Sequence, residues 1–190
     1  MGTGRYDIGT PEHERWLAAE ADRLLEFYRA AADKSGGGFW WLDRQGNPQP
    51  EQGKQLWLNA RMVHGFALGA LSGRDDLRAL VTHGVEFLAE GPLHDADHGG
   101  WMWSTDADGA VVDTSKQAYG HAFVLLASCS AQLAGVDASS LRDEVVSIID
   151  QRYWREADGL CVDTYDRTWS DLERYRGQNA NMHLVEAFLA

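Results

Sequence analysis

Three side chains able to bind or stack on a ligand share one face of an otherwise apolar stretch. Trp57, Arg61 and His64 follow the i, i+4, i+7 spacing that places residues on one side of an α-helix. An arginine on a buried helix needs a partner, because burying an unpaired cation is costly. Two interpretations stay open: a cavity that holds a polar or anionic ligand, or a structural ion pair with a carboxylate.

A second stretch, residues 116–123, carries Tyr119 and His121. The two residues are two positions apart, so in a helix they point to roughly opposite sides and only one can face a cavity. A histidine on an apolar helix is more often packed in the core. We therefore expect Tyr119 to face a ligand and His121 to lie between helices.

A third group comprises Asn179, His183 and Glu186. Asn179 and His183 are four residues apart and share a helix face, and Glu186 follows three residues later. An amide and an imidazole near the start of a helix form a directed hydrogen-bonding set. Imidazole also suits proton transfer near neutral pH, so this group predicts a polar site with an acid–base residue.

Apolar periodicity predicts the helices that must position these residues. The first is expected over residues 10–34, with Thr10 as its N-cap and Leu17, Leu24 and Tyr28 on a buried face. Further helices are expected over residues 54–71, 75–90, 115–133, 139–154 and 182–190. Strand-like stretches with turns are expected at residues 39–48, 99–109 and 158–165.

These elements recur with a period of about sixty residues, which indicates a repeated helix–hairpin–helix unit. The repeat is marked by three glycines at spacings of 62 and 59 and by three histidines at spacings of 57 and 62: Gly38, Gly100, Gly159, His64, His121 and His183. The second helix of each unit carries few charges and is expected to be buried on all sides. We therefore expect these helices to form the inner wall of an all-α toroid and the others its outer wall.

The array is expected to be unfinished. Three units make an open arc, and the last apolar helix reaches Ala190 without a capping residue. We expect residues 1–190 to be a fragment, or one part of a larger assembly. The alternative is a complete half-toroid that dimerises.

Composition narrows the class of protein. A net charge of −12 argues against a nucleic-acid partner, which needs a basic surface. Cys129 and Cys161 form no paired motif, which favours a reducing compartment. No signal peptide or membrane-spanning run is visible, so we expect a cytoplasmic protein that does not bind a membrane.

Other catalytic templates are not matched. The sequence has no GxSxG, Walker A or HExxH motif. The HDADH run at residues 94–98 is explained more simply by turn formation than by a metal, and no metal or cofactor is expected. The pairs Asp106/Asp108 and Asp163/Asp166 are expected in turns, although paired carboxylates also serve glycosidases.

Three stretches resemble the N-acylglucosamine 2-epimerase superfamily, most closely its mannose isomerase and sulfoquinovose isomerase branch. They are LWLNARM at residues 56–62, SKQAYGH at residues 115–121 and YRGQNANMHLVEAFL at residues 175–189. The family fold is an (α/α)6 toroid. The resemblance spans nearly all of this chain but only the first half of that fold. It implies that residues 1–190 are the N-terminal half of a single toroid domain, built of three helix–hairpin–helix units with short β-hairpins, and that the remainder of the toroid is absent from this chain.

The resemblance also implies a reaction and roles for particular residues. It implies aldose–ketose isomerisation of a free monosaccharide through a cis-enediol, without a metal. Trp57, Tyr119 and Asn179 resemble the family's substrate-binding residues; Arg61 resembles the arginine that steadies the enediolate, and His183 a histidine assisting ring opening. The family's main proton-transfer histidines lie in its second half, so we expect residues 1–190 alone to be inactive.

Mannose to fructose is the favoured reaction. A sugar 2-epimerase and a sulfoquinovose isomerase remain alternatives, because Arg61 can meet either a hydroxyl or an anionic group. A glycoside hydrolase or a non-catalytic sugar-binding fragment is less favoured, since no carboxylate pair lies on the expected inner helices.

Overall fold

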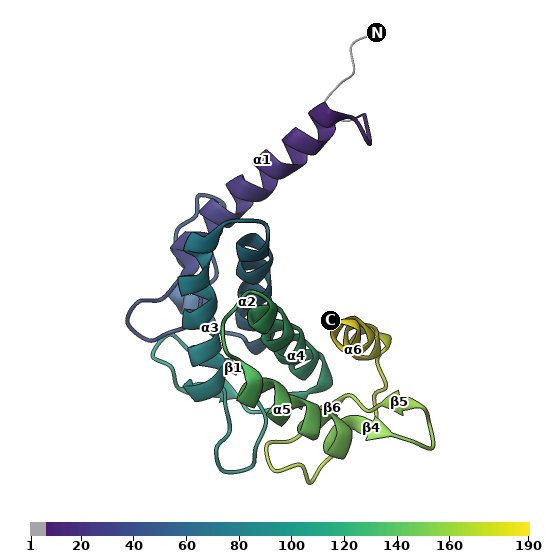
Figure 1. Ribbon diagram of the computed structural model, residues 1–190. Helices are drawn as coiled ribbons and strands as arrows, with labels where there is room; N and C mark the ends of the chain where they lie inside the picture. The colour runs from purple at the N-terminus through teal and green to yellow at the C-terminus, as the bar shows by residue number, and fades with distance from the viewer. Residues whose placement is uncertain (1–6) are drawn as a thin grey trace.

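Helices dominate the part of the chain that this computed structural model describes, residues 7–190 (Figure 1). Short 3-10 turns at Arg29–Ala31, Pro50–Gln52 and Asp75–Leu77 join them to neighbouring segments. The α-helices are α1 (Pro11–Tyr28), α2 (Leu56–Leu71), α3 (Arg78–Glu90), α4 (Ala118–Leu133), α5 (Ser139–Ile148) and α6 (Gln178–Leu189).

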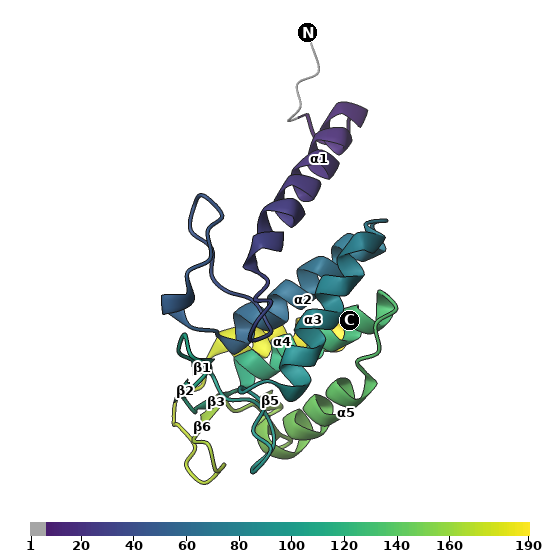
Figure 2. The same ribbon diagram turned by 90° about the vertical axis from the view of Figure 1, so that its left-hand side faces the viewer.

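The helices form two layers, as expected. In the inner layer α4 packs between α2 and α6, while α3 packs on α2 and α5 on α4 (Figures 1 and 2). Residues 120–128 of α4 are all buried, which explains why this helix carries almost no charge. Gly120 lies so close to the side chain of Leu56 that a Cβ would meet it at 2.7 Å, so the small residue allows α2 and α4 to approach.

The first helix departs from the prediction. Its start is as expected, because the Thr10 side chain accepts a hydrogen bond from the His13 amide and Pro11 opens the first turn. Its expected buried face is wrong: α1 has no fully buried residue, and Leu17, Leu24 and Tyr28 are 48%, 44% and 42% exposed. Both views show the reason, since α1 leans away from the other helices (Figures 1 and 2).

The strands are shorter than the aromatic stretches suggested. The first stretch forms only isolated bridges, Ala32 to Phe39 and Leu42 to Pro48. The later stretches form antiparallel pairs: β1 (Ser104–Thr105) with β2 (Val111–Asp113), β4 (Trp154–Arg155) with β5 (Leu160–Cys161), and β3 (Lys116–Gln117) with β6 (Thr164–Tyr165). The pairing of β3 with β6 ties the segment before α4 to the hairpin of the next unit.

Several boundaries also differ, and the first is that α1 ends at Tyr28 rather than near residue 34. Helix α6 begins at Gln178 rather than near residue 182, so Asn179 and His183 both lie on it. Helix α5 continues as a π-helical turn at Ile149–Tyr153, which places the buried Tyr153 against the inner layer. None of the helices in the described part of the chain is long and apolar enough to cross a bilayer.

Two buried ion pairs at equivalent places fasten the glycine-rich loops to the inner helices. Lys54, just before α2, donates to Asp33 and to the Gly37 carbonyl, both at 2.6 Å. Sixty-two residues later, Lys116 lies 2.9 Å from Asp95 and donates to the Gly99 carbonyl at 2.6 Å. The Lys116 and Asp95 side chains are fully buried, and Arg167 also pairs with Asp95.

Candidate functional site

The structure sets the register of the three units through a repeated side chain, here called the anchor residue. In each unit it accepts a hydrogen bond from a hairpin amide: Asn59 from Phe39 at 2.6 Å, His121 from Trp101 at 3.2 Å, and Asn181 from Cys161 at 2.9 Å. Each also bonds to the carbonyl four residues earlier on its own helix. The spacings of the anchor residues are 62 and 60.

The prediction that His64, His121 and His183 are equivalent residues of the three units is wrong, because the residues equivalent to His121 are Asn59 and Asn181. The counterpart of His121 is an asparagine in each of the other units, because asparagine and neutral histidine both offer an acceptor and a donor on one side chain. The expectation that His121 packs between helices is confirmed. It is fully buried and contacts the rings of Trp101 and Tyr153, and burial lowers its pKa to about 4.

The anchor register places the predicted site residues at matching levels of the inner wall. The first level comprises Trp57, Tyr119 and Asn179, and the second level comprises Arg61, Phe123 and His183. A third level, three residues further along each helix, comprises His64, Leu126 and Glu186. The i, i+4, i+7 spacing puts all three levels on one face of their helices.

Side chains of the first two levels contact one another, with the buried Phe123 ring lying beneath Arg61 and His183. The Arg61 guanidinium lies 4.3 Å from the centre of the Phe123 ring and 5.7 Å from that of Trp57. The His183 ring lies 4.7 Å from Phe123 and 5.2 Å from Tyr119, measured between ring centres. The structure thus brings together residues from α2, α4 and α6 that lie more than a hundred positions apart in the sequence.

Arg61 is exposed, and no carboxylate among residues 7–190 forms an ion pair with it. It rests on aromatic faces, where a guanidinium gains cation–π attraction without losing its donors. The structural ion pair left open by the sequence does not occur within the described residues. The five donors of Arg61 are therefore free to bind oxygen atoms of a ligand.

Asn179 lies at the first level and is exposed. It shares a helix face with His183, but its side chain is exposed and makes no hydrogen bond to the described residues. Its neighbour Asn181 instead holds the hairpin through both the amide and the carbonyl of Cys161. The two asparagines of the NAN run thus have different positions, one at the open surface and one against the hairpin.

Sequence reasoning missed several members of this region. Phe123 has no polar atom and is buried in the core, where its ring supports both Arg61 and His183. Trp41 stacks edge-on against Trp57 at 5.6 Å between ring centres and donates its indole N–H to Gln55. Spacings of 62 and 60, taken from the anchor residues Asn59, His121 and Asn181, would have placed Phe123 level with Arg61 and His183.

His64 lies at the third level with a defined partner. Its Nδ1 atom is 2.7 Å from the Ser130 hydroxyl of α4. Burial lowers the pKa of His64, and the nearby positive charge of Arg61 acts in the same direction, while Glu186 of α6 opposes both. His64 is therefore a neutral group near pH 7, within electrostatic reach of both Arg61 and Glu186.

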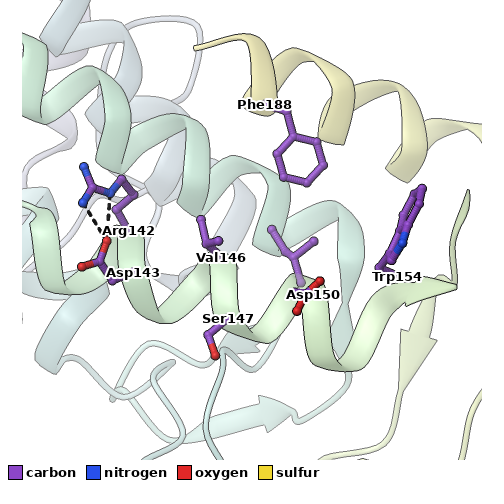
Figure 3. A pocket seen from close by; sticks show the side chains of 8 residues that line it. Arg142, Asp143, Val146, Ser147, Asp150, Trp154 and Phe188 are labelled. Carbon is purple, nitrogen blue, oxygen red and sulfur yellow. Dashed lines mark hydrogen bonds and ion pairs between the residues drawn. The ribbon is translucent and has the colours of Figure 1, made fainter. Parts of the chain in front are cut away.

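Hollows of different size open on the described part of the chain. One of about 290 Å³ adjoins Trp57 and Arg61 and is lined mainly by aromatic residues, among them Trp40 and Trp41. A larger one of about 800 Å³, here called the α5–α6 groove, lies between Val146 and Trp154 on one side and Phe188 of α6 on the other (Figure 3). No predicted site residue lines the groove.

The carboxylate and histidine clusters noticed in the sequence have structural partners. Asp95 is held by Lys116 and Arg167, and His94 pairs with Glu144 at 2.9 Å. Asp106 and Asp166 accept backbone amides inside their own turns. Across residues 7–190, no group of three or more His, Cys, Asp or Glu side chains is placed to hold a metal ion.

Replacing His121 tests the anchor assignment. His121→Leu is expected to lower the free energy of unfolding by about 1–3 kcal/mol, because the buried Trp101 amide loses its acceptor. His121→Asn is expected to lose less, since Asn59 and Asn181 already serve this purpose. The pKa of His121 is lower in the folded state, so its contribution to the free energy of unfolding falls as pH drops from 6.5 towards 4. His121→Asn should lack that fall, because asparagine does not titrate. Urea unfolding of the three proteins would measure both effects; an equal or larger loss for His121→Asn would contradict the assignment.

Comparison with known proteins adds the family to this geometry. The family model described as N-acylglucosamine 2-epimerase (GlcNAc 2-epimerase) matches residues 37–190. The chain belongs to this family. A D-mannose isomerase from Thermobifida fusca is 50% identical over 94% of the chain, and a cellobiose 2-epimerase from Ruminococcus albus is 26% identical over 88%.

The solved structures of the family agree with the layered fold. A crystal structure of D-mannose isomerase superposes over 99% of the chain with a TM-score of 0.86 at 26% identity. The chain spans 44% of the Thermobifida fusca protein, 46% of the Ruminococcus albus protein and 47% of that crystallised chain. The family members it matches are thus about twice as long, and the chain corresponds to one half of their toroid.

Proposed function

We propose that this chain provides the substrate-binding floor of an aldose–ketose isomerase of the mannose-to-fructose type. The observation that carries the proposal is the cluster of Trp57, Arg61, Tyr119 and His183, whose arginine forms no ion pair with a carboxylate among residues 7–190. A relative that is 50% identical and named D-mannose isomerase supports the choice of reaction.

The proposed roles follow from the chemistry of each side chain. Trp57 and Tyr119 offer aromatic faces to a sugar ring, and the exposed amide of Asn179 offers both a donor and an acceptor to its hydroxyls. In the isomerisation the C2 proton leaves, O1 is protonated to give a cis-enediol, and a proton is then added at C1 as O2 becomes the ketone. Arg61 would stabilise the oxyanion that develops on this path, and His183 would exchange protons with the sugar oxygens during ring opening.

We further propose that residues 1–190 form the N-terminal half of one toroid domain. Equivalent bridges, His94 to Trp101 and Trp154 to Cys161, show that Trp154 occupies the place of His94 in the preceding unit. Helix α5 covers His94 through Glu144, so a further outer helix would cover Trp154 by filling the α5–α6 groove. Such an enzyme would act on a free monosaccharide and, with Cys129 and Cys161 unpaired, in the reducing cytoplasm.

A 2-epimerase is the second candidate, favoured by relatives named cellobiose 2-epimerase. It shares removal of the C2 proton but returns that proton to the opposite face of the same carbon. An isomerase acting on a sulfonated sugar is the third, favoured because the Arg61 charge has no carboxylate partner in the described part of the chain. The products therefore decide among these three.

The experiment uses a chimera in which residues 1–190 are joined to the C-terminal part of the Thermobifida fusca D-mannose isomerase, beyond the segment that matches this chain. Incubated with D-mannose in D2O, the chimera is expected to give fructose with deuterium at C1, whereas residues 1–190 alone are expected to give no turnover. Deuterium at C2 with only aldoses present would indicate epimerisation. If mannose is unchanged but a sulfonated sugar is converted, the sulfonated sugar replaces mannose as the proposed substrate. Turnover by residues 1–190 alone would contradict the half-toroid proposal.

A further inference from the structure

Glu186 is an acidic residue of the inner wall for which the proposed reaction has so far given no use. It lies on α6 at the third level, three residues after His183, and its side chain is about half exposed. Its charge is near enough to His64 of α2 to raise the pKa of that imidazole. Glu186 therefore points along the same surface as the proposed sugar-binding residues.

The contact between Glu186 and His183 has a defined direction. The Glu186 Oε2 atom lies 2.8 Å from Nδ1 of His183. An ionised carboxylate has no proton and can only accept hydrogen bonds, so Nδ1 of the imidazole must carry the proton. In neutral His183, the Nε2 atom is then left with its lone pair.

Within the described part of the chain no group takes up that lone pair, although the His183 side chain is only 14% exposed. Nε2 makes no hydrogen bond to any group in residues 7–190. The rings of Phe123 and Tyr119 pack against the imidazole, and neither ring face competes as a strong hydrogen-bonding partner. His64, the other imidazole on this surface, is already engaged by Ser130 through its own Nδ1.

We propose that Glu186 is a positioning residue that holds His183 in the tautomer protonated on Nδ1, with Nε2 presented to a sugar hydroxyl as a proton acceptor. The use of that acceptor in ring opening rests on the proposed function. The tautomer itself does not, because it follows from the carboxylate contact alone. Glu186 does not touch the reacting atoms and acts through His183.

Nitrogen-detected histidine NMR on the 190-residue chain tests the assignment directly, because protonated and unprotonated ring nitrogens have widely separated shifts. The His183 signals are identified by their loss in His183→Gln. In the native chain near pH 8, His183 is expected to be protonated on Nδ1. In Glu186→Ala it is expected to change to mainly Nε2 protonation, because the acceptor for Nδ1–H is gone.

Two controls accompany this measurement. Val185→Ala alters the neighbouring exposed residue of the same helix and should leave the tautomer of His183 unchanged. His121 should remain protonated on Nδ1 in every variant, because that nitrogen bonds to the Gln117 carbonyl while Nε2 accepts the Trp101 amide. A native His183 protonated on Nε2, or a tautomer that Glu186→Ala does not change, would overturn the assignment.

A kinetic measurement on the chimera completes the test. Glu186→Ala is expected to lower kcat about tenfold or more while KM changes little, because binding groups stay in place and only the proton acceptor is lost. An unchanged kcat would overturn the positioning role. If the native chimera has no turnover while the native chain shows the Nδ1 tautomer, the proposed function fails and the Glu186 contact stands.

Discussion

Arg61→Ala is expected to lower the kcat of the chimera about 100- to 1,000-fold while leaving its stability almost unchanged. The activity loss follows because a fixed cation facing the developing enediolate stabilises charge that appears only on the reaction path. Stability is expected to hold because Arg61 is exposed and contacts the ring faces of Phe123 and Trp57 without a buried ion pair. Initial rates of fructose formation, with thermal unfolding of the same samples, would measure both quantities.

Two further variants make the Arg61 result specific. Arg44→Ala removes an exposed arginine from the first hairpin and is expected to leave kcat near the native value. Arg61→Lys keeps the charge but loses the planar array of donors, so we expect an intermediate rate. A native rate in Arg61→Ala would remove this residue from the reaction and leave it only a packing role on Phe123.

Lys116→Met is expected to lower the free energy of unfolding by about 3–5 kcal/mol at pH 7. The substitution leaves Asp95 as a fully buried carboxylate whose remaining charged partner, Arg167, is 40% exposed. Burial alone would raise the pKa of Asp95, but hydrogen bonds from Arg167 and Lys116 outweigh it and hold that pKa well below its usual range. The ionised form of Asp95 is thus the one that the fold requires.

The pH dependence distinguishes this cause from a general packing defect. Because the pKa of Asp95 is lower in the folded state, its ionised carboxylate contributes to the free energy of unfolding above about pH 4, and this contribution is lost as pH falls further. The difference between the native chain and Lys116→Met should therefore shrink below about pH 4. Denaturant unfolding at several pH values would measure this difference. Arg167→Ala is expected to lower the free energy of unfolding less than Lys116→Met does at neutral pH. A deficit independent of pH would contradict the ion-pair explanation.

Much of the helical architecture could be predicted from apolar spacing. The inner helices could be recognised because a helix packed on all sides has nowhere to place charged residues, as α4 shows. The opposite directions of Tyr119 and His121 also followed from helix geometry alone. The start of α6 could not be predicted in this way. Asn179 and Asn181 are poor signals of a helix start until their separate contacts are known.

Two features lay beyond the sequence for physical reasons. The apolar face of α1 indicates that Leu17 and Leu24 need cover, but periodicity cannot say which segment provides it, and residues 7–190 leave them exposed. The register of the units was misplaced because His121 and Asn59 perform the same hydrogen bonding with different side chains. The hydrogen bond made by the anchor residue is repeated in all three units, but the residue type that makes it is not.

The anchor residues also fix the rotational phase of the inner helices. An α-helix turns by about 100° for each residue, so a one-residue slip between an anchor and its hairpin would rotate that helix by a quarter-turn or more. Such a slip in α2 would carry Trp57 and Arg61 together away from Phe123, although neither residue had changed. The hairpins, which hold none of the proposed reacting groups, thus determine which face of each helix belongs to the proposed sugar site.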